Sequence, residues 1–600
     1  MAKNKKEEIV YKYGNLELPY QPSKYQEAIF DFILHKHGNL VIEASAGSGK
    51  TTTLLNILKL IHPSKKVLFA AFNTDIVKEI KMKTVNFKNV DVRTIHSLGF
   101  ILIKRNLGDE IQIKEGKYKE YITSYVNEHR ETLCNITPRN ILKFINNITN
   151  LCDYARYNLA ENEDDLDKLV KHHGMELVGN EIQLTLDVLE WGKNHTTVID
   201  YTDMVWFPYV LHLKPLGTKY DWLLLDEAQD QSIAQRELVL RCQRMGTRII
   251  FVGDENQSIY AFASASPEAF RLLKRLPNTT SLPLSISYRC PKKVVKFAQN
   301  YVPTIEYKED AIDGDVVYDA HLEDVNGGDM ILCRNNAPLM QVYNSLIRMG
   351  KPCFIRGKDI GSNLVKVVET FNQEFLHKDL TKDGLFVRLY DDLFSARRRI
   401  SETTNLDKAS IMKMSVISNK LDTINALTVL ADGLKTTEEL INRIKVIFSD
   451  EKATNKQITL STIHKAKGLE SDNVFIACKS LMPAKSVTQE WEQVQEHNLM
   501  YVAYTRSKRK LAFLDEKGFE SFTSETVSSD YLRYAEVCVS RLLNKSYGLI
   551  EKLSANTISH IIERSQPVVK PTIGVGKTLG SKKQPSSLRG NNRKKYLNHE

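Results

Sequence analysis

Residues 39–55, NLVIEASAGSGKTTTLL, constrain the fold more than any other stretch of this chain. The apolar run Leu40–Ile42 predicts a buried strand, a turn of small residues follows, and Leu54 and Leu58 then recur at helical spacing. A strand, a small-residue loop and a helix in this order indicate a phosphate-binding loop, because backbone N–H groups and the helix N-terminus can surround a phosphate. A chance Gly/Ser turn is the alternative, and the placement of the motif between strand and helix argues against it.

The loop assigns roles to individual residues. Lys50 is expected at the β- and γ-phosphates and Thr51 at Mg²⁺. The predicted nucleotide-binding residues are Ala44, Ser45, Ala46, Gly47, Ser48, Gly49, Lys50, Thr51 and Thr52. Ala44 stands where the usual motif has its first glycine. ATP and Mg²⁺ are therefore the expected cofactors.

Length and charge limit the remaining possibilities. Six hundred residues predict roughly three to five domains. The net charge is +10, and the segment 566–600 has eight Lys or Arg against one Glu, so it carries +7 of that charge. Because the rest of the chain is nearly neutral, a nucleic-acid site must come from a local groove and not from bulk charge.

Cysteines and apolar segments indicate the compartment. The eight cysteines are scattered without a CxxC pair, which disfavours a zinc or Fe–S site and fits a reduced cytosol. The N-terminus lacks the apolar core of a signal peptide, and the longest apolar patch, 205–213, is too short to cross a bilayer. We expect a cytoplasmic protein with no membrane partner.

Alternating strands and helices predict an α/β protein with two parallel sheets, each interrupted by a mainly helical insertion. Buried strands are expected near 40–42, 66–72, 90–95, 222–225, 247–252, 330–333, 352–355, 457–460 and 474–477. The predicted domains are 1–99 with 198–280, a helical insert 100–197, 281–360 with 457–530, a reduced helical insert 361–456, C-terminal helices 531–565 and a basic disordered tail 566–600.

A carboxylate pair follows one of these strands in LLLDEAQD, residues 223–230. Hydrolysis of a phosphoanhydride needs a metal clamp and a positioned water. Asp226 is expected to hold Mg²⁺, and Glu227 to orient or deprotonate the water. A surface Asp-Glu pair that opens a helix is the alternative, and the apolar run before the pair argues against it.

Together these residues resemble a superfamily 1 helicase of the UvrD/PcrA/Rep type. Further segments occur in that family's order: VGDENQSIYAF (252–262), LSISYRCP (284–291), STIHKAKGLE (461–470) and HNLMYVAYTRSK (497–508). The resemblance extends over roughly residues 20–360 and 455–515. It implies two RecA-like P-loop domains, each with a mainly helical insertion.

The resemblance also implies roles at the nucleotide. Gln257 would sense the γ-phosphate, and Arg289 and Arg506 would reach that phosphate from the second α/β unit. A surface ion pair is the alternative for either arginine alone, and the flanking SYR and YVAYTR patterns favour the site role. Adenine or ribose contacts are implied for Gln26, Tyr288 and Glu470.

Contacts to single-stranded DNA are implied in several of the same segments, since aromatic stacking and backbone charge hold a single strand. The predicted DNA-binding residues are Phe72, Asn73, Thr94, His96, Tyr260, Phe262, Arg334, Asn335, Thr462, His464 and Lys465. Core packing is the alternative for Phe72, and a hydrogen-bonded turn is the alternative for His96. The segment 200–204, DYTDM, resembles a family segment that we expect to position the strand, unless it is a plain helix cap.

Two features depart from the family pattern. Ala263 stands where the family has an arginine after the stacking aromatic. Phe72 lies directly before Asn73, one position away from where the larger bacterial enzymes have their aromatic residue. The insert 361–456 is also shorter than in the large bacterial enzymes. A compact, Asn/Lys/Ile-rich chain suits a phage-encoded member.

The predicted function is an ATP-dependent DNA helicase in replication, repair or recombination, and the resemblance implies 3′-to-5′ movement. Its expected partners are single-stranded DNA and single–double-strand junctions, with a single-strand-binding protein or a replication or repair factor at the second insert or the basic tail. A translocase that strips proteins from DNA with little unwinding uses the same motor and stays open. An ATP-gated binding subunit without turnover is disfavoured by the intact Asp-Glu pair and both arginines, and the segment after Tyr531 lacks the acidic cluster of a nuclease.

Overall fold

The computed structural model describes residues 10–517 except 15, 72–73, 130–139, 216–219, 261–266, 375–383, 387–388, 390–391, 394–419, 421–422, 450–456, 485–486 and 488. All of the described residues belong to one compact unit, Met1–Val527. Phe72, Asn73 and Phe262, the predicted C-terminal helices and the predicted basic tail lie outside the described residues.

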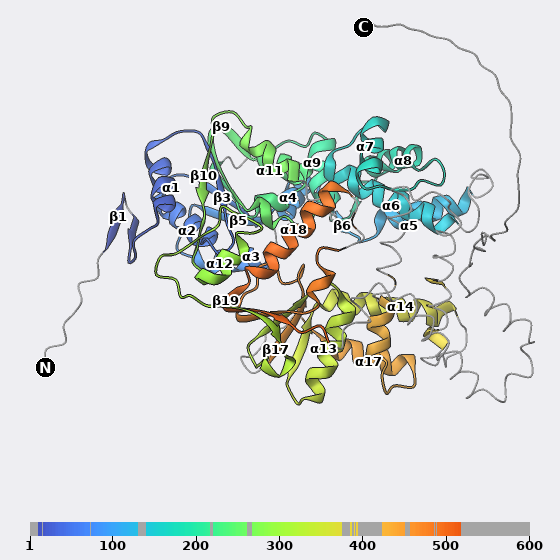
Figure 1. The fold of residues 1–600 in the computed structure, drawn as a ribbon. Coiled ribbons are helices and arrows are strands. Elements are labelled where there is room, and N and C mark those ends of the chain that lie inside the picture. The colour runs from blue at the N-terminus through green and yellow to red at the C-terminus, as the bar shows by residue number, and fades with distance from the viewer. Residues whose placement is uncertain are drawn as a thin grey trace, which may run out of the picture. The chain divides into compact units, whose positions relative to one another are not determined.

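A six-stranded parallel sheet with the order β10-β3-β9-β8-β4-β5 carries the phosphate loop (Figure 1). Its strands are β3 (Asn39–Ala44), β4 (Val67–Ala71), β5 (Val90–Thr94), β8 (Tyr220–Leu225), β9 (Gln243–Gly253) and β10 (Thr279–Leu284). Because every pairing is parallel, the carboxyl ends of the strands share one edge, where ligands bind in open α/β sheets.

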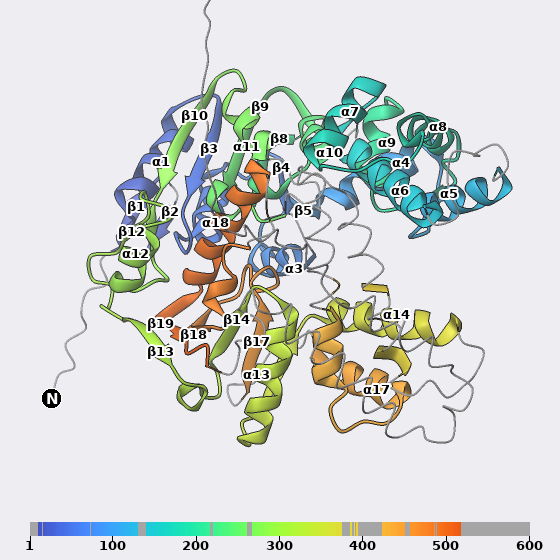
Figure 2. The ribbon, with the colours of Figure 1, turned by 45° about the vertical axis from the view of Figure 1, so that its right-hand side comes forward.

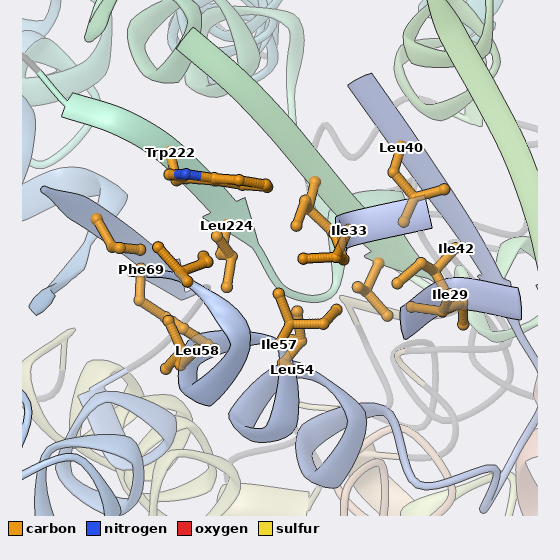
Figure 3. Close-up of a cluster of buried hydrophobic side chains, with 14 of the residues drawn as sticks. Ile29, Ile33, Leu40, Ile42, Leu54, Ile57, Leu58, Phe69, Trp222 and Leu224 are labelled. Carbon is orange, nitrogen blue, oxygen red and sulfur yellow. The ribbon is translucent and has the colours of Figure 1, made fainter. Parts of the chain in front are cut away.

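Alternate residues of the strands pack on opposite faces of this sheet. On one face Trp222 and Leu224 pack with the α1 and α2 side chains drawn in Figure 3. On the other face Leu223 and Leu225 pack against α4, α9, α10 and α11. Helices on both faces explain why these strands are continuous apolar runs and not alternating ones.

The elements around this sheet have the following bounds. The helices are α1 (Lys24–His35), α2 (Lys50–Leu60), α3 (Thr74–Lys83), α4 (Ile95–Leu107), α9 (Asp203–Val210), α10 (Ile233–Leu240) and α11 (Pro267–Lys274), with short 3₁₀ turns η1 (Ala228–Asp230) and η2 (Glu255–Gln257). A hairpin of β1 (Tyr11–Tyr13) and β2 (Leu16–Leu18) packs on the α1–α2 side through Leu16 and Leu18.

The helical region between β5 and β8 has its own core. It consists of α5 (Lys117–Glu128), α6 (Ile141–Asn158), α7 (Glu163–His172) and α8 (Glu181–Asn194), with a short pair of β6 (Gln112–Ile113) and β7 (Val198–Ile199). Side chains of α4 and α9 join this core, so the insertion is anchored on two helices that also cover the sheet (Figure 2).

The second sheet has seven parallel strands in the order β13-β19-β18-β14-β17-β15-β16. They are β13 (Asp315–Ala320), β14 (Met330–Cys333), β15 (Cys353–Arg356), β16 (Phe448–Ser449), β17 (Ile458–Thr462), β18 (Ser471–Ile476) and β19 (Ser507–Leu514). Around them lie α12 (Lys292–Ala298), α13 (Asn336–Arg348), α14 (Lys358–Glu374), α17 (Thr437–Ile447), α18 (Glu490–Tyr504), η4 (Leu322–Asp324), η5 (Lys479–Leu481) and the pair β11 (Ile286–Ser287) and β12 (Glu306–Tyr307). Two parallel sheets with helical insertions confirm the predicted fold class.

Two edge strands differ from the sequence prediction. β10 pairs with β3, so the first sheet continues beyond the boundary expected at residue 280. β10 and β13 have mostly exposed or half-exposed residues, which is why neither gives a continuous apolar run. Helix α4 also runs through the boundary expected at residue 99. The remaining domain boundaries stay predictions.

Candidate active site

The phosphate loop joins β3 to α2 and is built for close approach of its backbone. Gly47 and Gly49 have φ values of +72° and +79°, which favour glycine. A Cβ at Gly47 would lie 2.6 Å from the Cβ of Arg289, so no side chain fits there. The Ser48 hydroxyl is buried and has no hydrogen-bond partner among the described residues, as expected of a group that binds a polar ligand.

Lys50, the first residue of α2, points at the carboxylate pair that follows β8. Its Nζ lies 2.8 Å from Glu227 Oε2, and Gln229 Nε2 donates to the same oxygen over 2.7 Å. Glu227 has a φ of +50°, which turns its side chain toward Lys50 directly after the buried strand. Asp226 Oδ1 accepts the Glu227 N–H at 2.9 Å. The predicted phosphate lysine and the predicted catalytic carboxylate are therefore direct neighbours.

Burial and the neighbouring charges shift the pKa values of the two carboxyl groups. Burial and the adjacent Glu227 charge raise the pKa of Asp226 to about 7, with Lys50 opposing. Burial would also raise the pKa of Glu227, but Lys50 and Lys467 lower it to about 2. Glu227 is thus ionised at neutral pH, the state that a water-orienting acceptor needs.

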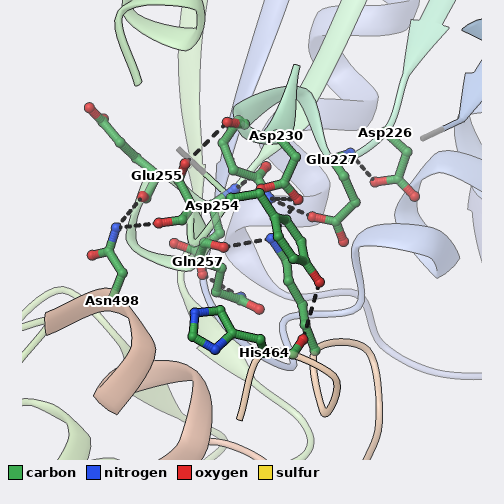
Figure 4. Close-up of polar contacts among 12 residues, drawn as sticks. Asp226, Glu227, Asp230, Asp254, Glu255, Gln257, His464 and Asn498 are labelled. Carbon is green, nitrogen blue, oxygen red and sulfur yellow. Dashed lines mark hydrogen bonds and ion pairs between the residues drawn. The ribbon is translucent and has the colours of Figure 1, made fainter. Parts of the chain in front are cut away.

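The turn after β9 adds a second polar chain to the site. Gln257 Nε2 donates to Asp254 Oδ2 over 2.6 Å, and Gln257 Oε1 accepts from Arg506 Nη2 at 3.3 Å. Figure 4 shows Asp254 and Gln257 beside Asp226, Glu227 and Asp230. The predicted γ-phosphate sensor therefore lies between the first-sheet carboxylates and an arginine that comes from the second sheet.

The two predicted arginines have different surroundings. Arg506 has an exposed fraction of 1% and also donates to Val502 O and Leu469 O, so its position is fixed by the second sheet. Arg289 Nε lies 2.7 Å from Glu470 Oε2. The two residues predicted for the γ-phosphate and the ribose are thus paired with each other.

The predicted adenine contacts lie together at the other end of the loop. Gln26 Nε2 donates to Thr53 Oγ1 over 3.2 Å, and the Tyr288 hydroxyl lies 3.4 Å from Gln26 Oε1. The Tyr288 N–H donates to Gly47 O at 2.9 Å. Tyr288 is 44% exposed, so part of this residue is accessible to a ligand such as a base. Of the predicted loop residues, Thr52 is exposed and is the least enclosed.

Helix α18 connects the second sheet to several parts of this site. The Tyr501 hydroxyl accepts the Ala46 N–H of the phosphate loop at 3.0 Å. Asn498 Nδ2 donates to Glu255 O and Ser258 O, at 3.2 and 2.9 Å (Figure 4). At its first turn the Trp491 Nε1–H donates to His172 O of α7 over 3.0 Å. The helix thus contacts the helical insertion, the turn after β9 and the phosphate loop.

The predicted DNA contacts follow the carboxyl ends of strands in both sheets. Thr94 ends β5 and caps α4 through its bond with the Ser97 N–H, and burial lowers the pKa of His96, which lies beside it. In the second sheet Thr462 ends β17, and His464 and Lys465 lie in the turn that follows. Lys465 is exposed, whereas Thr462 is buried.

The side chains of two predicted DNA contacts form hydrogen bonds within the protein. Arg334 Nε and Nη2 bind Glu496 of α18 at 3.0 and 2.7 Å, and the Tyr260 hydroxyl donates to His464 O at 3.1 Å. Burial and Arg334 lower the pKa of His464 to about 4, so its imidazole is neutral at pH 7. Asn335 lies half-buried directly before α13. These residues line the edge where the strands end, and their contacts with DNA stay predictions.

Two carboxylates of the DYTDM segment belong to an ionic cluster of the helical insertion. Asp203 is fully buried and binds Lys117 Nζ at 2.9 Å, the Tyr118 hydroxyl at 2.7 Å and Arg156 Nη1 at 2.9 Å. Asp200 binds the same Arg156 nitrogen at 2.8 Å. Both carboxylates therefore stabilise the core of the helical insertion, and the strand-positioning role of the segment stays a prediction.

Arg156→Met is expected to lower the free energy of unfolding by about 3–5 kcal/mol, because it removes the cation paired with Asp200 and leaves buried Asp203 with Lys117 alone. Chemical denaturation followed by circular dichroism measures this loss. The matched variant Arg105→Met removes an exposed arginine of α4 and should change the value by less than about 0.5 kcal/mol. Equal effects of the two variants would contradict the role of the buried cluster.

The sequence analysis missed several residues of the site. Asp230, Asp254, Lys467, Asn498 and Tyr501 lie inside the quoted motifs but received no role. Their place inside the quoted motifs was the available signal. Their partners could not be inferred, because these lie on distant segments: Tyr501 and Ala46 are 455 positions apart.

A resident metal would have few protein ligands here. The part of the chain that the structure describes has no group of three or more His, Cys, Asp or Glu placed to hold a metal. Mg²⁺ typically takes one or two protein oxygens and completes its shell with phosphate and water, so Thr51 and the buried Asp226 carboxylate fit it. Among the described helices, none has the length and hydrophobicity that a membrane crossing requires.

Two family models of known proteins match the segments that contain these site residues. The family model of the UvrD/REP helicase N-terminal domain matches residues 25–277, and that of the UvrD-like helicase C-terminal domain matches residues 457–514. The first match contains the phosphate loop, the carboxylate pair and the turn after β9. The second contains the β17 turn, α18 and Arg506.

Curated relatives are DNA helicases by name. F-box DNA helicase protein 1 of Schizosaccharomyces pombe is 24% identical over 86% of this chain and 60% of its own length. ATP-dependent DNA helicase Rep of Buchnera aphidicola is 20% identical over 80% of this chain and 92% of its own length. A probable DNA helicase II homolog of Mycoplasma pneumoniae is 20% identical over 79% of this chain and 81% of its own length. The chain belongs to the UvrD-like family of superfamily 1 ATP-dependent DNA helicases.

Proposed function

We propose that this chain is a motor that hydrolyses ATP to move along single-stranded DNA in the 3′-to-5′ direction and to unwind the duplex ahead of it. The observation that carries the proposal is the hydrogen bond between Gln257 of the first sheet and Arg506 of the second. This bond joins the polar residues of the two sheets into one site. The predicted DNA contacts follow the carboxyl ends of strands in the same two sheets.

ATP binding requires two ion pairs of the site to exchange partners. Lys50 would leave Glu227 for the β- and γ-phosphates, and Arg289 would leave Glu470 for the γ-phosphate. Lys508 Nζ lies 2.5 Å from Glu470 Oε1, so Glu470 keeps a cation after the exchange. Each exchange replaces a protein carboxylate by phosphate oxygens as the partner of the same cation, and this limits its cost.

The released Glu227 carboxylate would accept a hydrogen bond from the attacking water. Lys467 and the hydrogen bond from Gln229, which also lower its pKa, would still favour the ionised form after Lys50 has left. Gln257 would orient the γ-phosphate from the side of Asp254, and the two arginines would stabilise charge in the transition state. Thr51 and Asp226 would hold Mg²⁺, which supplies charge neutralisation on the phosphates when bound.

Movement would follow from contacts that change between the two sheets. Arg289, Arg506 and Glu470 come from the second-sheet side, so nucleotide in the site favours the state in which the sheets are close. The DNA contacts lie at the same sheet edges, so this state grips the strand differently from the open one. The direction of movement follows the family resemblance.

Steady-state ATP hydrolysis with and without single-stranded DNA tests the proposal. We expect kcat to rise at least about tenfold with saturating poly(dT), because the segments 252–262 and 461–470 each contain both predicted DNA contacts and predicted ATP-site residues. Duplexes with a 3′ tail should then be unwound, and duplexes with a 5′ tail should not. Turnover that ignores DNA would contradict the motor, and unwinding from 5′ tails would contradict the direction.

A translocase with weak unwinding is the second candidate, because the predicted second insert, residues 361–456, is shorter in sequence than that of the large bacterial enzymes it resembles. Displacement of streptavidin from a 3′-biotinylated strand measures translocation without unwinding. Fast displacement with little strand separation would favour this candidate. Partners in replication or repair, and the cytoplasmic location, stay predictions.

A further inference from the structure

Lys467 lies in the turn after β17 and reaches the first sheet. Its Nζ is 2.5 Å from Asp230 Oδ2 and 2.6 Å from Gln257 O, and it lies 5.1 Å from the centre of the Tyr260 ring. The side chains of Lys467 and Asp230 are 10% and 2% exposed. A charged pair this deeply buried is costly unless it is well bonded, so the geometry is closely specified.

Asp230 connects Lys467 to the carboxylate predicted to orient the water. Gln229 Nε2 donates both to Asp230 Oδ2, over 3.3 Å, and to Glu227 Oε2, over 2.7 Å. Asp230 Oδ1 is buried and has no hydrogen-bond partner among the described residues. Lys467 therefore supplies the main compensation for this carboxylate, and one amide separates it from Glu227.

Lys467 also holds the segment that carries the γ-phosphate sensor. It binds the backbone carbonyl of Gln257, whose side chain contacts Asp254 and Arg506. A displacement of Lys467 would thus disturb both sides of the attacking water: Glu227 through Gln229, and Gln257 through its backbone.

The other end of the same turn carries predicted DNA contacts. His464 and Lys465 lie three and two residues before Lys467. The Ala466 N–H donates to Thr462 O at 3.0 Å and the Lys467 N–H to His464 O at 3.4 Å, so the turn is closed by its own hydrogen bonds. A bound DNA strand that moves His464 or Lys465 would therefore move Lys467 with them.

We propose that Lys467 is the positioning residue through which DNA bound at the 462–467 turn orients Glu227 and Gln257 for hydrolysis. The inference rests on the proposed function, since it explains how DNA would stimulate the ATPase. Lys467 touches neither nucleotide nor DNA in this role. It acts by holding Asp230 and the Gln257 backbone in place.

Lys467→Met removes the charge and keeps most of the side-chain volume. We expect kcat at saturating poly(dT) to fall about 10–100-fold, the range for loss of an outer partner of a catalytic group. The poly(dT) concentration that gives half-maximal stimulation should stay within about threefold of wild type. Lys465→Met should raise that concentration, because it removes a charge that we assign to the strand.

Lys274→Met is the matched control, since Lys274 is a half-buried lysine ion-paired to Glu43 and Glu255 outside the turn. Its DNA-stimulated kcat should equal that of wild type. Lys467→Arg should recover part of the stimulation, because it restores the charge beside Asp230. Asp230→Asn, made from the other side of the pair, should reproduce the loss if Lys467→Met proves unstable in a melting experiment.

The outcomes separate the inference from the function on which it rests. Wild-type turnover without DNA stimulation would contradict the proposed function, and this inference with it. Normal wild-type stimulation together with an unchanged kcat in Lys467→Met and in Asp230→Asn would overturn the inference alone. An arginine variant as impaired as the methionine variant would also overturn it, because the charge would then not be the cause.

Discussion

Glu227→Gln should lower the DNA-stimulated kcat for ATP by about 10²–10⁴-fold, the usual contribution of a positioned acid–base group. The amide keeps the size of the side chain and its bond from Gln229, but it accepts a hydrogen bond from water far less strongly than the carboxylate. Nucleotide affinity should be kept or increased, because Lys50 loses the anion with which ATP competes for it. A coupled phosphate-release assay gives kcat, and fluorescence of a labelled ATP analogue gives the affinity.

Glu255→Gln is the matched control for this variant. Glu255 lies in the same turn as Gln257, but its carboxylate pairs with Arg271 and Lys274 and not with the site. Its kcat should remain within about twofold of wild type. Near-normal turnover in Glu227→Gln would remove Glu227 from the catalytic role.

Arg289→Ala should lower the same kcat by about 10³–10⁵-fold, the range for an arginine delivered to a transferring phosphoryl group. Glu470 keeps Lys508 as its partner in this variant, so the protein should stay folded. The loss should fall on kcat more than on KM, because the arginine acts mainly in the transition state. Steady-state kinetics at saturating poly(dT) separates the two parameters.

Arg509→Ala serves as the comparison, because Arg509 also forms an ion pair, with Asp472, but both side chains are largely exposed. Such a pair contributes about 0–1 kcal/mol, and its removal should leave kcat unchanged. A loss of less than tenfold in Arg289→Ala would show that the Glu470 pair is the main role of this arginine.

The elements that the sequence predicted well are those buried on both faces. β3, β4 and β8 are apolar runs because helices cover both sides of the first sheet, and such runs are visible without knowledge of their neighbours. β10 lies at the sheet edge and its TTSLPL sequence is half solvent-exposed, so no local pattern marked it as a strand.

In the site, too, residues in contiguous motifs were predicted, whereas contacts between distant segments were not. The phosphate loop and the Asp-Glu pair are contiguous motifs and were assigned from their own residues. The pairing of Arg289 with Glu470 spans 181 positions, and that of Lys467 with Asp230 spans 237. The first contact depends on how the second α/β unit folds and the second on how the two sheets meet, and single-sequence patterns encode neither. The ion pairs of the DYTDM segment could not be predicted for the same reason, since Arg156 is remote from it in sequence.

Helix α18 has a consequence for how this chain can vary in length. Its Trp491, Glu496, Asn498 and Tyr501 contact four different segments, and Arg506 follows its last turn. An α-helix turns about 100° per residue and rises 1.5 Å, so one inserted residue would rotate every later contact away from its partner. Loops elsewhere can gain or lose residues at small cost. The spacing within residues 491–506 is therefore as strict a signature of this site as the residues themselves.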